Sequence, residues 1–510
     1  MRRFTAIIIL LCMIIFAGCS QIKAGEQKEQ TEDYFTSMEK EPDLSYEVPV
    51  SAPGILVNQL GYMTESSKIA VFKGKEMPEQ FHVVDAESGK VVYTGSLEEQ
   101  GYNQASGEYN SFGDFTDLRI QGSYYIDAPI LGRSYSFLIS NDVYDRFFKE
   151  SCKEYYYNRC GMTLTEEYAG EYAHNACHIG KAVLGEDVSV SMDVSGGWHQ
   201  DEKGQKDVVT AAKTMSVMML AYELYGDSFE DDMGIPESGN HIPDILDEVK
   251  YEADWLLKMQ DQQTGAVYSG LVIYQPDGDL GKSTGTYVEA PTPDAEKAFA
   301  MAMAKFSYLY QNYDTEYATT CLKAADRAFK HAKMDEGRTQ DKWEFAAAAE
   351  LYRAAGQSSH QKYVVDFLKA EDLEERDEVV LMGCITYIAT KQPVNVDLCG
   401  KIMKTLMAQA EDISAAAEDS LYMTAENGEQ DNNSLLLDMM YLTTVDHIIA
   451  NSEYETTIEN HLHYFLGRND GAVSFVNIIG ENVDGSRGIV KQFDANSKLI
   501  FMLSEIMGHR

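Results

Sequence analysis

One stretch decides how this chain is interpreted: Asp193-Val-Ser-Gly-Gly-Trp-His-Gln-Asp-Glu-Lys203. Two adjacent glycines, a tryptophan and a histidine are followed by an amide, two carboxylates and an ammonium group. On the C-terminal side, apolar residues recur with a period of 3.6 from Val208 to Leu224, which predicts a helix. The stretch is therefore a loop that leads into the helical part of the chain.

The region before this loop, residues 53–140, is rich in β-forming residues. Its short runs are separated by Gly, Pro, Asp and Ser at a spacing that suits a β-sandwich. The runs are Gly54–Asn58, Lys68–Phe72, Gln80–Val84, Lys90–Tyr93, Ser123–Asp127 and Ser134–Ile139. We therefore predict a small all-β sandwich over 53–140.

From about residue 142 to residue 510, the apolar pattern has the period of a helix, and there is almost no strand signal. The predicted helices are 144–157, 208–224, 242–259, 296–310, 317–332, 343–355, 361–370, 379–389, 402–410, 435–449, 454–466 and 493–506. The sequence therefore predicts a large all-α domain over 142–510.

The charge of the chain limits its partners. Lys and Arg total 42 against 82 Asp and Glu, a net charge of -40. Such a surface repels nucleic-acid phosphates and anionic lipid, so we expect no nucleic-acid partner. It tolerates a neutral partner such as a glycan.

The first 19 residues have the features of an export signal. Two arginines precede an apolar stretch, residues 6–18, that is too short to span a bilayer. The stretch ends in Phe16-Ala-Gly-Cys19-Ser20, which resembles a bacterial lipobox. That resemblance implies cleavage before Cys19, lipidation of its thiol and an anchor on the outer face of a bacterial cell membrane. An ordinary secretory signal is the alternative, and both predict export.

Residues 20–52 are polar and acidic, which is typical of a flexible tether between an anchor and a folded domain. Six cysteines follow the signal, too few for a disulfide-rich scaffold.

The frame Asp193–His199 resembles the active-site loop of glycoside hydrolase family 9, the cellulase-type inverting glycosidases. Further segments resemble that family in the same order: 158–178, 234–249, 343–356 and 463–469. Ile55–Tyr62 resembles the immunoglobulin-like module that precedes many of its catalytic domains. The resemblance covers most of 53–510. It implies an (α/α)6 barrel of six inner and six outer helices, with the active site at one barrel mouth.

An inverting glycosidase needs a general base and a general acid, two carboxyl groups roughly 6.5–9.5 Å apart. By the resemblance, the two aspartates of the family loop fall on Gln200 and Lys203, and the general acid falls on Val490. An amide takes no proton at neutral pH. An ammonium group becomes a base only if its pKa falls by several units. The resemblance thus implies an O-glycosyl hydrolase fold in which no catalytic position is intact.

One rearrangement keeps catalysis open. Asp201 or Glu202 could replace the base, because a shift of one residue moves a side chain by about 3.5 Å. The carboxylates nearest the acid position are Glu481 and Asp484, in a segment that is shorter than in the family and lacks its sugar-binding patch. General acid–base assistance contributes about 10²–10⁴-fold per group, so loss of both would nearly abolish hydrolysis.

Four residues suggest a metal site: Cys160, Cys177, His178 and His199. Similar residues hold a structural zinc in many bacterial members of the family. Two thiolates and two imidazoles form a closed tetrahedral set with no position for water. The alternative is two buried thiols and two surface histidines.

Two further sets of site residues are predicted. The acidic run 231–248, with Asp231, Asp232, Glu237, Asp244, Asp247 and Glu248, could bind calcium or could be a solvated helix start. Trp198, Tyr268 and Tyr274 could stack on sugar faces or could pack in the core.

Three functions follow from these alternatives. The favoured one is a surface lipoprotein of the cellulase-like type that binds or degrades β-glucan, a neutral polysaccharide, with lost or strongly reduced hydrolysis. The second is an active inverting β-1,4-glucanase with a rearranged carboxylate pair. The third is a non-catalytic surface protein that binds a partner.

Overall fold

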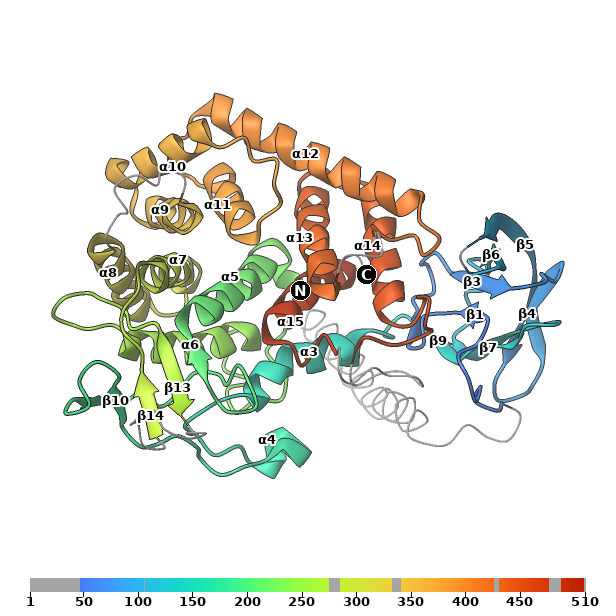
Figure 1. The fold of residues 1–510 in the computed structure, drawn as a ribbon, viewed down its shortest axis with the longest axis horizontal. Helices are drawn as coiled ribbons and strands as arrows, with labels where there is room; N and C mark the ends of the chain where they lie inside the picture. The colour runs from blue at the N-terminus through green and yellow to red at the C-terminus, as the bar shows by residue number, and fades with distance from the viewer. Residues whose placement is uncertain are drawn as a thin grey trace, which may run out of the picture.

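A computed structural model describes residues 46–104, 106–274, 285–332, 341–425, 431–476 and 488–508. The signal with Cys19, residues 20–45 of the predicted tether, and the carboxylates Glu481 and Asp484 lie outside these ranges. Within them, no helix has the length and apolar character needed to cross a membrane. Figure 1 shows a β-domain at one end of a larger helical domain.

The β-domain is a sandwich whose strands pair in the order β1-β3-β6-β5-β4-β7-β9-β2, with β8 paired to β7. The strands are β1 Ile55–Leu56, β2 Gly61–Tyr62, β3 Ile69–Gly74, β4 Gln80–Asp85, β5 Val91–Asn103, β6 Glu108–Asp114, β7 Gly122–Ala128, β8 Gly132–Arg133 and β9 Phe137–Ile139. Strand β6 was not predicted, because its residues, EYNSFGD, lack β-branched side chains and alternate poorly. β6 is held by long-range pairing with both β3 and β5.

The tether prediction is wrong at its C-terminal end. Tyr46 is buried in the sandwich, with its ring centroid 5.0 Å from that of Tyr125. Its hydroxyl donates a hydrogen bond of 3.0 Å to the carbonyl of Ser134. An aromatic body with a satisfied polar tip anchors the chain here, six residues before the predicted boundary.

The helical domain is the expected (α/α)6 barrel. Six inner helices pack in a ring that closes from the last to the first: α5 Val208–Leu224, α7 Pro293–Tyr310, α9 Lys342–Ala355, α11 Glu378–Ala389, α13 Asn432–Ile449 and α15 Phe493–Gly508. Six outer helices surround them (Figure 1): α3 Asp145–Tyr157, α6 Asp244–Met259, α8 Thr315–His331, α10 Ser358–Ala370, α12 Val396–Glu418 and α14 Ser452–Phe465. Short helical turns lie at α4 Glu166–Ala169, η1 Gly170–Tyr172 and η2 Gly226–Ser228.

The inner helices are buried on nearly all sides, which explains their composition. In α11, seven of the first eight residues after Glu378 are buried. Gly383 lets α9 approach closely, because an added Cβ would lie 2.4 Å from the Phe345 ring. The outer helices bury only one face and are amphipathic.

The N-terminal ends of the inner helices form one mouth of the barrel. An outer helix precedes each inner helix and returns the chain, so all six inner helices begin at the same end. Five of them start with a side-chain N-cap: Asp207, Thr292, Asp341, Asp377 and Asp431. Such caps satisfy backbone N–H groups that the first turn leaves free.

The prediction of almost no strand after residue 142 is wrong at this mouth. A five-stranded sheet of order β11-β10-β14-β13-β12 lies there, with β12 directly before α5. Its strands are β10 Ala182–Leu184, β11 Ser191–Met192, β12 Lys206–Asp207, β13 Gly270–Tyr274 and β14 Gly285–Val288. Strands of two to five residues are too short to show alternation in the sequence.

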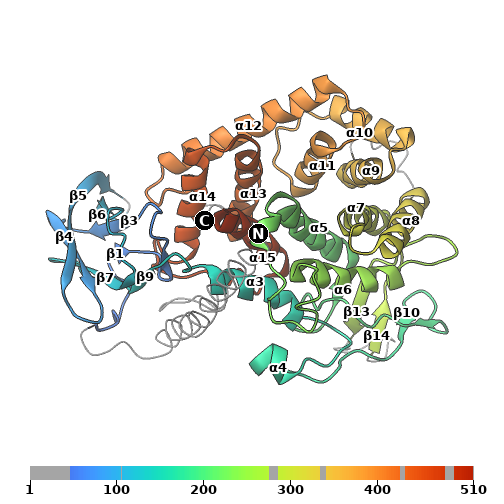
Figure 2. The same ribbon diagram turned by 180° about the vertical axis from the view of Figure 1, so that it is seen from behind.

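The sandwich lies beside α14, at the opposite side of the barrel from this small sheet, in both views (Figures 1 and 2). Asn58 joins the two domains: its side chain donates a hydrogen bond of 3.2 Å to the Tyr144 hydroxyl and lies 3.0 Å from His463 Nδ1. The sandwich therefore does not contribute to the mouth.

Candidate functional site

The glycines of the Asp193–Lys203 loop allow it to pack against α6. Gly196 and Gly197 have φ values of +99° and +70°. A Cβ on Gly197 would lie 2.7 Å from Trp255 Cγ and 2.9 Å from Glu252 Oε2. Only glycine fits both the left-handed backbone and this close approach.

Trp198 anchors the loop in the core. Its side chain is fully buried between the rings of Tyr155 and Phe493, at centroid distances of 5.0 and 5.6 Å. Its indole N–H donates 3.1 Å to Glu248, and its backbone N–H donates 2.6 Å to Glu252. The prediction that Trp198 stacks on a sugar is therefore wrong, because both ring faces are covered by protein.

The buried side chain of Lys206 holds the same loop by hydrogen bonds to its backbone. The Lys206 ammonium donates to the carbonyls of Val194 at 2.9 Å and Gly196 at 2.6 Å, and lies 3.6 Å from Cys160 Sγ. Burial lowers the pKa of Lys206 and raises the pKa of Glu252 to about 8. This role of Lys206 was not predicted from the sequence. A lysine two residues before the apolar helix that begins at Val208 was the signal that could have revealed this role.

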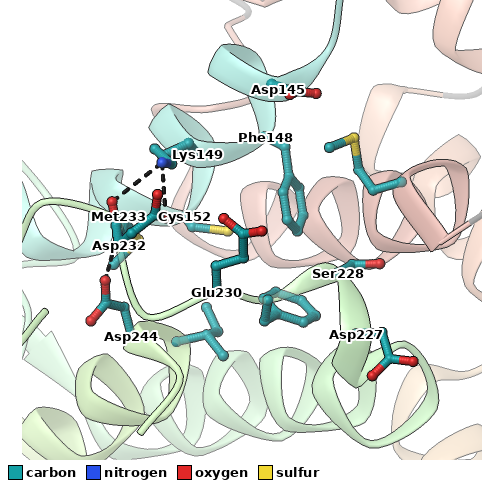
Figure 3. A pocket seen from close by; sticks show the side chains of 13 residues that line it. Asp145, Phe148, Lys149, Cys152, Asp227, Ser228, Glu230, Asp232, Met233 and Asp244 are labelled. Atoms are coloured by element: carbon teal, nitrogen blue, oxygen red, sulfur yellow. Dashed lines mark hydrogen bonds and ion pairs between the residues drawn. The ribbon is translucent and has the colours of Figure 1, made fainter. Parts of the chain in front are cut away.

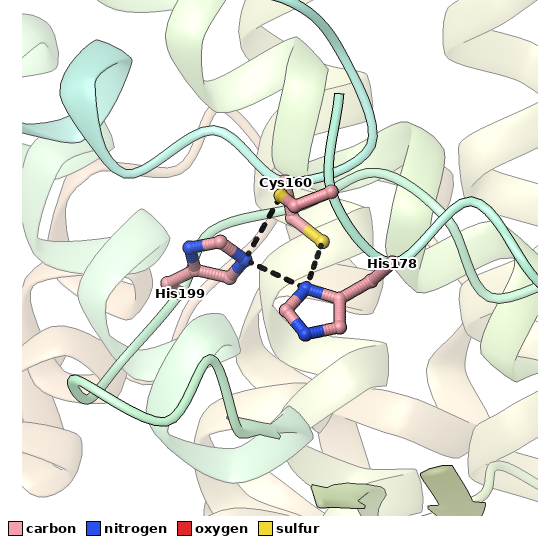
Figure 4. Close-up of side chains that lie close together, drawn as sticks. Cys160, His178 and His199 are labelled. Carbon is pink, nitrogen blue, oxygen red and sulfur yellow. Dashed lines mark hydrogen bonds between the residues drawn. The ribbon is translucent and has the colours of Figure 1, made fainter. Parts of the chain in front are cut away.

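The four predicted metal ligands come together beside this loop (Figure 4). One ligand atom from each of Cys160, Cys177, His178 and His199 lies within 4.8 Å of all the others. His178 Nδ1 is 3.2 Å from His199 Nε2, and the sulfur atoms of Cys160 and Cys177 lie 3.6 and 3.5 Å from one ring each.

The donor chemistry of this cluster fits a tetrahedral metal ion. Two ring nitrogens that face each other at 3.2 Å cannot both be lone-pair acceptors unless a proton or a cation lies between them. His178 is held at φ +48°, a conformation that non-glycine residues rarely adopt. Such strain persists where the surroundings fix a functional geometry.

Gln200 forms a structural clamp rather than a free side chain. Its amide nitrogen donates 2.8 Å to the carbonyl of Asp207, and its amide oxygen accepts 2.8 Å from the backbone N–H of Asp207. Asp207 is the N-cap of α5 and accepts 2.7 Å from Thr210 N. The clamp thus closes the 200–207 loop onto the start of α5.

Asp201, Glu202 and Lys203 continue this loop beside the Cys/His cluster. Asp201 accepts hydrogen bonds from the backbone N–H groups of Lys203 at 3.0 Å and Gln205 at 2.9 Å, and from the Gln205 side chain at 2.7 Å. Partial burial works in the opposite direction, but these hydrogen bonds lower the pKa of Asp201. Glu202 and Lys203 are exposed to solvent.

Four charged side chains form a closed ring of ion pairs at the mouth, which we call the mouth quartet: Lys213, Glu378, Lys498 and Asp494. The successive N–O distances are 2.6, 2.8, 2.6 and 3.1 Å. The quartet links α5 to α11, three helices further along the inner ring, and to α15. Although burial favours the neutral acid, Lys498 and Lys213 lower the pKa of Asp494.

Comparisons with known proteins agree with this geometry. Residues 144–485 match the model of glycosyl hydrolase family 9, and residues 50–133 match the cellulase N-terminal ig-like domain. The chain belongs to glycosyl hydrolase family 9.

Its relatives include a cellodextrinase of Butyrivibrio fibrisolvens, 32% identical over 84% of this chain and 85% of the relative. Endoglucanase D of Acetivibrio thermocellus is 28% identical over 84% of this chain and 73% of the relative. Among solved structures, a metagenome-derived family 9 endoglucanase has a TM-score of 0.78 at 25% identity, covering 89% of this chain and 98% of that one. A Bacteroides ovatus family 9 structure has a TM-score of 0.77 at 22% identity, covering 89% and 99%.

The residue expected at the general-acid position, Val490, lies in the core of this chain. Val490 is 1% exposed and belongs to the main apolar cluster. The next residue, Lys491, forms an ion pair with both carboxylate oxygens of Glu154, at 2.9 and 2.7 Å. Neither residue offers a proton donor at the mouth.

The acidic run 231–248 does not form the predicted calcium site. Asp231 accepts from the backbone of Gly239 and His241, both at 2.6 Å, and Glu248 pairs with Arg159 at 2.6 Å. Among the residues that the structure describes, only the Cys/His cluster brings three or more such ligand atoms together. The carboxylates of the run instead bind the backbone of the loop before α6 and the side chain of Arg159.

The remaining aromatic candidates differ in position. Tyr268 is partly buried, packs against the core with its side chain, and pairs through its backbone with Pro291. Tyr274 ends β13, and its side chain lies outside the described structure. Tyr268 therefore remains the one candidate for a sugar contact whose position can be given.

Proposed function

We propose that this family 9 protein binds β-glucan at the barrel mouth and hydrolyses it very slowly or not at all. The observation that carries the proposal is the Gln200 clamp. Its amide gives one acceptor and one donor to the backbone of Asp207. A carboxylate has no proton to donate, so the residue at the family position has been recruited to hold the loop.

Three carboxylates at the mouth already have partners. Asp201 accepts three hydrogen bonds within its own loop, and Asp494 and Glu378 each face two lysines of the mouth quartet. A general acid must carry a proton at the working pH. The lowered pKa of Asp494 opposes that role.

A β-glucan is the polymer that the names of the relatives suggest, since they include a cellodextrinase and endoglucanases. A neutral polysaccharide is also compatible with the net charge of -40. Retained binding without turnover would make this chain a pseudoenzyme.

We further propose that Cys160, Cys177, His178 and His199 hold a structural zinc ion. Zinc would supply cross-linking and no bound nucleophile, because four protein ligands complete its coordination. The cluster joins the segment of Cys160 to the Trp198 loop, where Cys160 N already donates 2.7 Å to the carbonyl of Gly197. The Cys19 lipobox supports a further proposal, that the protein is exported and lipid-anchored. Loss of membrane association in Cys19→Ala would test it.

The decisive experiment measures binding and cleavage of cellohexaose with the same preparation. We expect calorimetric binding without product over hours. Tyr268→Ala should weaken binding, while Tyr102→Ala on the distant sandwich should not.

Turnover that disappears in Asp201→Asn or Glu202→Gln would instead establish an active enzyme with a rearranged base. Absence of both binding and turnover would leave the partner-binding function and refute the proposal.

A further inference from the structure

The two ends of the barrel offer a glycan different surfaces. The end opposite the mouth holds a cavity of about 260 Å³, where α5 and α15 end (Figure 3). Its charged side chains are five carboxylates and one lysine, and its two aromatic rings, Phe148 and Phe229, face each other with centroids 5.3 Å apart. A surface of this kind gives a neutral sugar ring little to stack on. A sugar contact is therefore better sought at the mouth.

Trp343 is a partly exposed tryptophan at the mouth. The chain has three tryptophans, all in its described part; Trp198 and Trp255 are fully buried, and only Trp343 is partly exposed. Trp343 is the second residue of α9, and the inner helices begin at the mouth. It was not predicted as a sugar contact, because its segment has the regular apolar period of a helix.

The indole of Trp343 packs on a floor of small side chains. Trp343 and Val209 both pack against a cluster of fully buried alanines, Ala212 of α5 and Ala298 and Ala302 of α7. Because α5 and α7 are inner helices, the indole extends from α9 towards the inside of the barrel. Protein therefore covers one part of the ring, and the rest is exposed at the mouth.

The mouth quartet adjoins this floor. Lys213 follows Ala212 directly and comes four residues after Val209, a spacing that places two side chains on one face of a helix. Its ammonium group pairs with Glu378 at 2.6 Å and with Asp494 at 3.1 Å. The indole and this ammonium group therefore lie on neighbouring parts of the mouth.

Lys213 has a donor left for a ligand. An ammonium group has three N–H donors, and among the described residues two carboxylates engage that of Lys213. Lys498, the other cation of the quartet, uses all three donors, two on the acids of the quartet and one on Asn433 at 2.9 Å. The side chain of Lys213 is 21% exposed, against 2% for Lys498. Although burial favours the neutral amine, Glu378 and Asp494 raise the pKa of Lys213 and keep it charged.

An indole beside one spare ammonium donor suits a β-linked glucose unit. Small-molecule sites combine an apolar surface with a few polar groups that fix the orientation of the ligand. The equatorial hydroxyls of β-glucose leave C–H groups on both faces of the ring, so one face can cover an aromatic side chain. A hydroxyl at the edge of the same ring can then accept a hydrogen bond from a lysine.

We propose that Trp343 and Lys213 form a sugar subsite at the centre of the mouth. Trp343 stacks on one β-glucose ring, and Lys213 donates to a hydroxyl of that ring. The inference rests on the proposed binding of β-glucan and names two of its contacts. The quartet then holds the ammonium group in place for the sugar, besides linking α5 to α11 and α15.

Tryptophan fluorescence of the full chain tests the stacking. Acrylamide is the suitable quencher, because it is neutral and a net charge of -40 repels iodide. We expect acrylamide to quench Trp343 in preference to the two buried tryptophans, and Trp343→Phe should remove this accessible fraction. Saturating cellohexaose should abolish most of the quenching, while maltohexaose, which has α linkages, should leave it unchanged.

Calorimetry with cellohexaose measures the contribution of each side chain. Trp343→Ala should weaken binding about tenfold, because the aromatic contact and its buried area are lost. Lys213→Met should weaken binding about three- to tenfold, because a hydrogen bond from a charged donor is lost. Lys362→Met removes an exposed, ion-paired lysine of α10 and is the matched control, which should bind like the wild type.

The quenching of the wild type and the variant Trp343→Phe keep the test valid if Trp343→Ala impairs folding. If cellohexaose binds without protecting Trp343, and Trp343→Ala binds like the wild type, the subsite is refuted and the proposed function stands. If Lys213→Met binds like Lys362→Met, the contact from Lys213 is refuted. If cellohexaose does not bind at all, the proposed function and this inference both fail.

Discussion

Changing Gln200 to glutamate tests the clamp with almost no change in shape. The variant keeps the acceptor for Asp207 N but loses the donor for the Asp207 carbonyl. Two oxygen atoms would then face each other across a contact that is now 2.8 Å long. An unsatisfied buried partner costs about 1–3 kcal/mol, and this contact is only partly buried, so we expect the free energy of unfolding to fall by about 1 kcal/mol.

The loss should depend on pH. A protonated glutamate can again donate to the Asp207 carbonyl, so folding favours the neutral acid and raises its pKa above the unfolded value. The variant should therefore match the wild type at low pH, and the difference should grow as the pH rises through the folded pKa.

Urea unfolding of wild type and Gln200→Glu between pH 4 and pH 8 measures both effects. Gln104→Glu, at an exposed position in the sandwich, is the control for added charge. Equal stability of Gln200→Glu and wild type across this range would refute the clamp and, with it, the structural explanation of residue 200.

Three further predictions concern the rest of the site. Lys498→Met removes one corner of the mouth quartet and should destabilise the barrel by about 3 kcal/mol in urea, since it leaves two acids sharing one lysine. Because Asp494 has a lowered folded pKa, its stabilisation is present above the unfolded pKa of 3.8 and is lost as the pH falls through the folded value. Lys498→Met should therefore show a weaker loss of stability in acid than the wild type, and a parallel acid limb would contradict the quartet. Elemental analysis should find about one zinc per chain in the wild type and in Cys399→Ser, but none in Cys177→Ser, with a lower melting temperature after chelation. Trp198→Ala should destabilise the fold by about 3–5 kcal/mol. If it instead folds normally and loses only glycan binding, Trp198 contacts sugar after all.

Much of the fold could be predicted from local pattern. The start of α5 at Val208 and most other helices follow from the period of apolar residues, because each barrel helix is long enough for that period to appear. The Cys/His cluster could be predicted because its four residues lie in short motifs of one family.

Other features depend on residues far apart in sequence. The sheet β10–β14 joins Lys206 to Leu271, and its strands are too short to be recognised alone. The sequence left open whether Trp198 stacks on a sugar, because it does not show which side chains cover the indole ring. The partners that cover it, Tyr155 and Phe493, lie on α3 and α15.

The sequence by itself determined the family, the two domains and the absence of carboxylates at positions 200, 203 and 490. Only the tertiary structure decided what the replacements do: Gln200 clamps a loop, Val490 fills the core and Lys203 faces solvent. The physical reason is that the identity of a side chain sets which protons it can give or accept. Its burial and its partners, which the packing of distant helices creates, set whether that capacity is used for structure or remains available to a ligand.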